Sequence, residues 1–255
     1  GLQIAIGSSA MSNSIAEMEA LDTFIVTGSN TTETHPVIST FLRQAVVQGK
    51  AKLIVIDPRQ IEMTDFATLW LRQKPGTDVA LFQAMAHVIV EENLYNLDFM
   101  DARTEGFEEY KLSLMDCTPE WAESLSGVPA DLIREAARTY AKAKTAAIYW
   151  GMGISQSVHG TDNTLSLANL ALLTGHIGQP GTGLNPLRGQ NNVQGACDMG
   201  GLPNVDPGYQ NVTIPEHREK FEKAWGFAAS DVPTSDVRRL SDKIGLTHTE
   251  IFDAI

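Results

Sequence analysis

The 255-residue sequence is short of cysteine, of long apolar runs and of positive charge, and each shortage excludes a class of protein. Its two cysteines, Cys117 and Cys197, are far apart and neither belongs to a CxxC pair, so neither a zinc site nor a disulfide framework is expected. No run of about 18 apolar residues occurs, which excludes a transmembrane helix. The net charge of −12 argues against nucleic acid or an anionic membrane surface as a partner.

Positive charge is scarcest around the stretch "NPLRGQNNVQGACDMGG", which spans 185–201. Arg188 is the sole lysine or arginine between Thr145 and Pro215, and its neighbours are mostly glycines and neutral amides. A buried guanidinium without a partner costs several kcal/mol, and the segment offers few carboxylates. We therefore expect Arg188 to meet a bound anion, in surroundings that also suit a polar cofactor. A purely structural loop is the alternative.

Familiar nucleotide-binding, hydrolase and metal motifs are missing as well. The sequence contains no GxGxxG fingerprint, no P-loop and no nucleophile elbow. His35, His87, His159 and His176 do not have metal-ligand spacing. We expect each of them to be a hydrogen-bonded structural histidine, and we predict no metal ligand in this sequence.

Apolar runs and helical patterns alternate in the first half of the chain. Three runs predict strands, "DTFIVTG" at 22–28, "AKLIVIDPR" at 51–59 and "TLWLRQKPG" at 68–76. Helical patterns with start and stop signals follow at 35–49 and 77–93. This alternation predicts an α/β fold of the Rossmann-like, doubly wound kind, with a mostly parallel sheet and helices on both faces.

The second half begins with a charged, helical middle section from about Leu94 to Lys144. A strand at 145–153 and a helix at 160–175 are expected next, the helix being closed by a glycine. The segment 179–215 is dense in glycine, asparagine and proline, which predicts a long ordered loop. A short charged helix is expected at 215–226.

Polar turns follow the predicted strands, and open parallel sheets bind ligands beyond the carboxyl ends of their strands. After the first strand, Asn30, Glu33, Thr34 and His35 stand just before a helix N-terminus. Such a position suits a phosphate, because the backbone N–H groups there have no partners within the helix. The alternative for this turn is an ordinary helix cap.

The turns after the other strands offer a carboxylate, a cation and glycines. Asp57 can accept from a ribose hydroxyl or a guanine N–H edge, and Arg59 can meet a phosphate; a local ion pair between them is the alternative. In the next turn Gly76 permits the bend, and capping of the following helix is the favoured explanation for Asp78. The glycines of 151–153 allow close approach of the backbone.

The Arg188 stretch, continued as "NPLRGQNNVQGACDMGGLPNVDPGY", resembles the catalytic subunit of molybdenum- or tungsten-dependent formate dehydrogenases, in the molybdopterin oxidoreductase family. The segments "LIVIDPR" and "AAIYWGMGISQ" are similar to the second strand and to a later strand of the same family, and the resemblance extends over nearly the whole chain. It implies a dinucleotide-binding-like domain at 1–187, followed at 188–255 by an active-site loop and the incomplete start of a further domain. It also implies an internal fragment, with the selenocysteine or cysteine metal ligand and a [4Fe-4S] cluster in a preceding part.

The resemblance further implies oxidation of formate to carbon dioxide at a molybdenum or tungsten centre held by two molybdopterin guanine dinucleotides, with electron-transfer subunits as partners and a cytoplasmic location. The fragment alone is expected to be inactive. Another molybdopterin oxidoreductase, such as a nitrate reductase, and a non-catalytic nucleotide-binding or interaction domain are the alternatives. Arg188 would hold the carboxylate of formate. The residues expected against the cofactor are Gly28, Asn30, Glu33, Thr34, His35, Asp57, Arg59, Gly76, Asp78, Gly151, Met152, Gly153, Gln156, Gly189 and Gln190.

Overall fold

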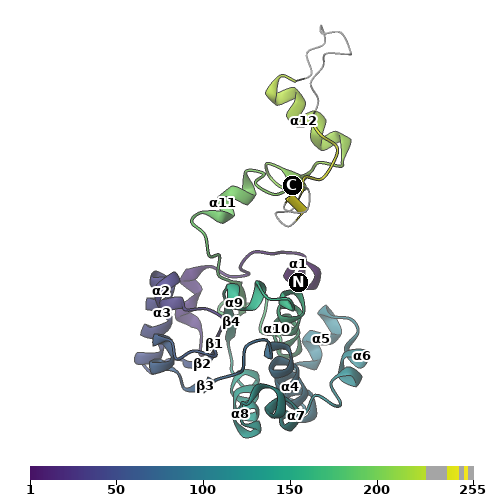
Figure 1. Ribbon diagram of the computed structural model, residues 1–255. Coiled ribbons are helices and arrows are strands. Elements are labelled where there is room, and N and C mark those ends of the chain that lie inside the picture. The colour runs from purple at the N-terminus through teal and green to yellow at the C-terminus, as the bar shows by residue number, and fades with distance from the viewer. Residues whose placement is uncertain (228–239, 247–249, 252–255) are drawn as a thin grey trace. The chain divides into compact units, whose positions relative to one another are not determined.

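The computed structural model describes residues 1–227, 240–246 and 250–251 (Figure 1). It divides into two compact units, Gly1–Gly189 and Gln190–Ile255, which are called unit 1 and unit 2 below. Each unit is described by itself.

Unit 1 is built on a five-stranded parallel sheet in the order β3-β2-β1-β4-β5. The central strand is buried on both faces, as its uninterrupted apolar and β-branched sequence predicts. The predicted α/β class and parallel sheet are thereby confirmed. The strands are β1 Thr23–Thr27, β2 Lys52–Ile56, β3 Leu69–Leu71, β4 Ala146–Trp150 and β5 Gly183–Pro186.

Helices cover both faces of this sheet (Figure 1). Alternation along each strand sends Ile25 and Ile148 into one hydrophobic core and Phe24 and Tyr149 into the other. The first core is formed with α4, α8 and α10, and the second with α3 and two short 3-10 helices, η1 and η2. The helices of unit 1 are α1 Leu2–Ile6, η1 Ile15–Ala20, α2 Thr31–Thr34, α3 Pro36–Val47, η2 Glu62–Phe66, α4 Asp78–Glu91, α5 Leu97–Arg103, α6 Phe107–Ser113, α7 Pro119–Ser126, α8 Ala130–Ala141, α9 Met152–Ser155 and α10 Gly160–Thr174.

The helices of the middle section, and the residues at which they begin and end, agree with the sequence. Helix α7 begins where the Thr118 hydroxyl accepts from the Trp121 N–H, and it ends at Gly127, whose φ of 76° suits glycine. Pro129 directly precedes α8, and Gly175 closes α10 with a φ of 72°. The helical middle section that we expected from about Leu94 to Lys144 is therefore confirmed.

The segment that we expected as a long loop contains a strand. β5 pairs in parallel with β4, and its other edge is bonded to the N-terminal segment, where the Ser12 N–H donates to the Leu184 carbonyl. Two of its four residues, Gly183 and Pro186, have poor strand propensity, so no local pattern indicates it. The segment is a strand because it pairs with β4, and not because its residues favour strands.

Unit 2 carries the remaining regular structure among the described residues. It contains α11 Val193–Asp198, the antiparallel pair β6 Val205–Asp206 and β7 Gln210–Asn211, and α12 Pro215–Trp225. The last of these is the short charged helix that the sequence predicts. Among the helices that the structure describes, none combines the length and the hydropathy that a membrane crossing would require.

Candidate functional site

The strand order creates a switch point between β1 and β4. The chain continues from β1 to α3, which packs on one face of the sheet, and from β4 to α10, which packs on the other. The loops that follow these two neighbouring strands therefore diverge, and a crevice opens between them at the carboxyl edge. The polar turns singled out in the sequence lie at this edge.

Three glycines allow the two loops at the switch point to touch. The Gly153 N–H donates to the Gly28 carbonyl oxygen at 3.0 Å. A Cβ atom on Gly28 would lie 2.8 Å from the Ile154 nitrogen, and one on Gly151 or Gly153 would lie 2.8 Å from the Gly28 oxygen. The φ of 54° at Gly28 also suits glycine. Close packing of the loops thus accounts for these glycines, whatever else lies against them.

A cleft of about 390 Å³ opens beside these loops. All four turns of the sequence analysis contribute to it, so the fold brings together residues that are far apart in the chain. Gly28, Asn30, Asp57, Arg59, Gly76, Asp78 and Gly153 are predicted residues that line this cleft, and Ser29, Pro58, Gln73, Pro75 and Ser157 are lining residues that sequence reasoning missed.

Asp57 places a buried carboxyl group in this cleft, at the tip of β2. Its side chain is only 7% exposed, and Oδ1 accepts from the Arg59 backbone N–H at 2.8 Å. Burial raises the pKa of the Asp57 carboxyl, the Asp78 carboxylate acts in the same direction, and the N–H and charge of Arg59 oppose them. Among the described residues the direct contact of this carboxylate with Arg59 is to the backbone N–H, which does not support the alternative of a local ion pair between the two side chains.

Asp78 is not the cap that we favoured. Thr77 occupies the N-cap position of α4, and its hydroxyl donates to the Lys74 carbonyl. The buried Asp78 carboxylate instead accepts from the Gln73 side-chain amide at 2.9 Å. Gln73 lies two residues after the end of β3, and its amide holds this carboxylate. Asp78 therefore lines the cleft, and one of its carboxylate oxygens is already hydrogen-bonded to Gln73.

Two further polar groups of the cleft are acceptors without a donor in the part of the chain that the structure describes. Asn30 Oδ1 and Gln73 Oε1 are buried and have no hydrogen-bond partner among the described residues. Leaving a buried acceptor unsatisfied costs about 1–3 kcal/mol. Together with the carboxylates of Asp57 and Asp78, these oxygens give the cleft an acceptor-rich lining that suits a ligand with several N–H or O–H donors. Gln73 carries no motif, and its position in the turn after a predicted strand was the one available signal.

His35 joins the first turn to the Arg188 segment. Its Nε2 lies 2.6 Å from the Arg188 carbonyl oxygen, and because a carbonyl only accepts, Nε2 carries the proton. The other ring nitrogen lies 2.8 Å from the Thr34 hydroxyl. His35 thus fixes backbone that is 153 positions away in the sequence.

Arg188 lies two residues after the end of β5, next to Leu187, which bonds to the last residue of β4. The Leu187 N–H donates to the Trp150 carbonyl at 2.8 Å, and a Cβ atom on Gly189 would lie 2.8 Å from the Met152 sulfur. Arg188 itself is partly buried. The backbone on either side of the guanidinium is therefore held by neighbouring loops of unit 1.

A sequence model of the family described as "Molybdopterin oxidoreductase" matches residues 3–250. The chain belongs to the molybdopterin oxidoreductase family. The resemblance noted in the sequence is thereby confirmed at the level of the family. The fold agrees, because acetylene hydratase from Pelobacter acetylenicus, a solved structure, superposes with a TM-score of 0.62 at 29% sequence identity, covering 68% of this chain and 23% of that one.

Curated relatives of this molybdopterin oxidoreductase chain include formate dehydrogenases. Formate dehydrogenase H of Escherichia coli (strain K12) is 49% identical over 242 residues, and the F420-dependent formate dehydrogenase 1 subunit alpha of Methanococcus maripaludis is 51% identical over 225 residues. The alignments cover 95% and 88% of this chain, and 33% of each relative. The chain therefore spans a third of the length of these relatives.

Eight expected cofactor residues of this molybdopterin oxidoreductase chain lie outside the cleft lining: Glu33, Thr34, His35, Gly151, Met152, Gln156, Gly189 and Gln190. Glu33 and Gln156 are exposed, and Met152 is 40% exposed beside Gly189. Gln190 is the first residue of unit 2. Their contacts with a cofactor stay predictions. His87 Nδ1 and His176 Nε2 each bond to a backbone carbonyl, as expected of structural histidines, whereas the His159 side chain is mostly exposed and lies 3.7 Å from the Asp162 carboxylate.

Proposed function

We propose that this chain is the part of a formate dehydrogenase catalytic subunit that binds one molybdopterin guanine dinucleotide in the cleft of unit 1 and presents Arg188 to formate. The acceptor-rich lining of the cleft is the observation that carries this proposal. The relatives that bear the name formate dehydrogenase support the choice of substrate. The complete subunit would hold two such dinucleotides around molybdenum or tungsten, contain a [4Fe-4S] cluster, work with electron-transfer subunits and reside in the cytoplasm.

The guanosine end of such a cofactor fits the described lining. Guanine presents an N1–H and an exocyclic amino group along one edge, and the ribose adds hydroxyl donors. The cleft offers the carboxylates of Asp57 and Asp78 and the unpartnered oxygens of Asn30 and Gln73. Donors of the ligand would therefore satisfy oxygens that the protein leaves without partners. Adenine has an acceptor at N1 and would oppose these oxygens.

The phosphates of the dinucleotide need a different surface. Arg59 is exposed at the rim of the same cleft, where its guanidinium can meet a pyrophosphate. The touching loops of Gly28 and Gly153 expose backbone without side chains, which lets a ligand come close. The cleft thus combines acceptors for the base with a cation for the phosphates.

Arg188 would bind the carboxylate of the substrate. A guanidinium can donate two parallel hydrogen bonds to a carboxylate, which fixes the plane of formate and so directs its C–H bond. The bonds from His35 to the Arg188 carbonyl and from the Leu187 N–H to Trp150 hold the backbone that carries this group. Formate loses a proton and two electrons to give carbon dioxide, and the bound metal cofactor supplies the electron acceptor. The protein's own part is to bind, orient and shield the substrate.

Calorimetric titration of the chain with guanosine and with adenosine tests the base site without any metal. We expect guanosine to bind at least about tenfold more tightly, because adenosine leaves buried acceptors unpaired. Asp57→Asn should remove much of this preference, since an amide offers a donor where a carboxylate accepts. Equal affinity for the two nucleosides, or no effect of Asp57→Asn on the preference, would contradict the proposal.

A further inference from the structure

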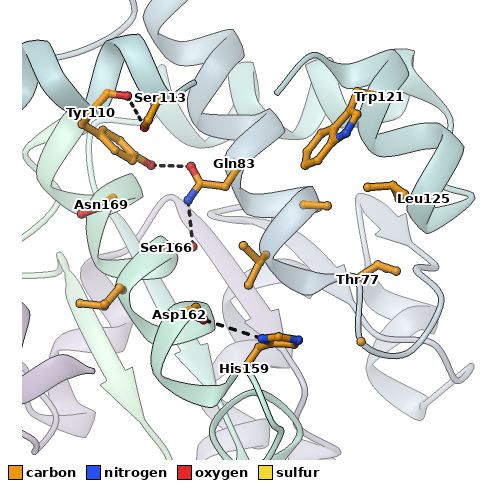
Figure 2. Close-up of a pocket in the computed structure, with 14 residues that line it drawn as sticks. Thr77, Gln83, Tyr110, Ser113, Trp121, Leu125, His159, Asp162, Ser166 and Asn169 are labelled. Carbon is orange, nitrogen blue, oxygen red and sulfur yellow. Dashed lines mark hydrogen bonds and ion pairs between the residues drawn. The ribbon is translucent and has the colours of Figure 1, made fainter. Parts of the chain in front are cut away.

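A second hollow in unit 1, of about 690 Å³, lies between α4, α6, α7 and α10 (Figure 2). We call it the α4 pocket. Pockets that bind small molecules commonly enclose about 300–1,000 Å³ and combine apolar walls with a few fixed polar groups. Gly76 lines both the α4 pocket and the cleft, but the other lining residues differ. The α4 pocket therefore has a chemistry of its own.

A row of neutral polar side chains forms one side of the α4 pocket. The Tyr110 hydroxyl donates to Gln83 Oε1 at 3.1 Å, and Gln83 Nε2 donates to the Ser166 hydroxyl at 3.3 Å (Figure 2). Burial raises the pKa of the Tyr110 phenol, so this group stays neutral. Ser166 accepts this bond and has its own O–H left to donate, and the Asn169 side-chain amide, which hydrogen-bonds to Tyr110, has a second N–H. This side is fixed in place and offers donors.

The opposite side of the α4 pocket is apolar and partly open. Trp121 and Leu125 lie one turn apart on α7 and are 38% and 43% exposed (Figure 2). Val79 and Ala80 of α4 and Leu165 of α10 continue this surface. A half-exposed indole beside apolar neighbours offers a flat face on which an aromatic ring can stack.

The charges that line the α4 pocket disfavour an anionic ligand. Among the described residues that line the α4 pocket there is no lysine or arginine. His159 and Asp162 lie 3.7 Å apart, and both side chains are mostly exposed. A phosphate or carboxylate would find no cation here except a histidine that already faces a carboxylate. An anionic ligand would therefore lose hydration without compensation.

From these contacts we infer that the α4 pocket binds an uncharged, flat heteroaromatic molecule that stacks on Trp121 and accepts hydrogen bonds from Ser166 and Asn169. The volume admits one fused ring system with substituents. The carbonyl oxygens of such a ring would meet the donors of the polar row, and its faces would bury the exposed apolar surface. This site is separate from the dinucleotide cleft and does not depend on it.

Caffeine is a suitable probe for the α4 pocket, because it is flat, uncharged and soluble and carries two carbonyl acceptors. Titration of the full chain, followed by tryptophan fluorescence and calorimetry, should give saturable binding with a Kd below about 1 mM. Trp121→Ala should weaken binding at least about fivefold, as expected for loss of one stacking face. Asn169→Ala should weaken it by a smaller factor. Theophylline-7-acetate, the same ring with a carboxylate, should bind at least about tenfold more weakly.

Matched controls separate this site from other surfaces. Trp225 of α12 is 48% exposed and lies outside the α4 pocket, so Trp225→Ala should leave the Kd for caffeine unchanged. Asp57→Asn should also leave it unchanged, whatever that variant does to guanosine. Circular dichroism checks that Trp121→Ala remains folded. Absence of saturable caffeine binding, equal binding of the charged analogue, or an unchanged Kd in a folded Trp121→Ala variant would each overturn the inference.

Discussion

Arg188 is the residue on which the proposed substrate role depends, and its planar guanidinium distinguishes it from lysine. In the complete catalytic subunit, Arg188→Lys keeps the charge but loses the two parallel hydrogen bonds that would fix formate. We expect the KM for formate to rise and kcat to fall, with a combined loss of about ten- to a hundredfold in kcat/KM. Steady-state kinetics with formate measure this directly. Unchanged kinetics would refute the substrate role.

His35 provides a subtler test at the same scale, because its bond is to the Arg188 carbonyl and not to the guanidinium. Loss of one such bond in His35→Ala should lower kcat/KM in the complete subunit about three- to tenfold, chiefly through KM. His35→Gln retains a donor and should recover part of this loss. If alanine and glutamine behave identically while thermal stability falls in both, the histidine is structural and does not position Arg188.

Asp57 couples stability to pH in a definite direction. Its folded-state pKa lies above the ordinary value of 3.8, so this carboxyl favours the native state below pH 3.8, and that contribution is lost as pH rises through the folded pKa. Asp57→Asn removes the charge that burial disfavours and keeps an acceptor for the Arg59 N–H. Urea unfolding should therefore find the variant more stable than the wild type at pH 7, with the difference disappearing on acidification. A difference independent of pH would contradict this account.

Single residues differ in how well the sequence predicts them. Arg188 was conspicuous because charge is scarce around it, and Asp57 because it ends an apolar strand. Gln73 was missed, since an amide after a strand has no signature, and the favoured capping role of Asp78 was wrong because that amide holds its carboxylate. The bond between His35 and Arg188 could not be predicted, as it joins positions 153 residues apart.

The cleft of unit 1 depends on the contact between the loop after β1 and the loop after β4. Glycine substitutions test how closely these loops pack. Gly28 and Gly49 both have positive φ, 54° and 68°, but only at Gly28 would a Cβ atom meet backbone, at 2.8 Å. Gly49→Ala should cost about 1–2 kcal/mol through φ alone. Gly28→Ala should cost at least about 2 kcal/mol more, because overpacking adds to the same strain. Denaturant unfolding of both variants measures the difference, and equal losses would show that the loops can move apart.

Among the elements, those with strong local patterns were predictable, and the edge strand β5 was not. β1, β2 and β4 are apolar runs that the core requires on both faces, and α7, α8 and α10 carry caps, prolines and closing glycines. β5 consists of Gly183, Leu184, Asn185 and Pro186, and it becomes a strand through pairing with β4 and the Ser12 segment. Such order arises only in the assembled fold, so local patterns cannot indicate it.

At the scale of the whole molecule, the two units differ in how much core they contain. Nearly all buried apolar side chains of the described residues belong to unit 1, and Cys197 is the one in unit 2. The switch point, the cleft and the α4 pocket are likewise formed within unit 1. A domain boundary near 187/188 stays a prediction from the sequence, but the distribution of the core makes it testable.

Truncation after Gly189 tests whether unit 1 is an independent folding domain. Because the buried core lies almost wholly before this residue, we expect the shortened chain to unfold cooperatively, with a Tm within about 5 °C of that of the full chain. It should also keep the preference for guanosine over adenosine, since all residues that line the cleft are retained. Differential scanning calorimetry and nucleoside titration supply the two measurements. A shortened chain without a cooperative transition would mean that the residues after Gly189 complete the core, and the boundary would then have to be abandoned.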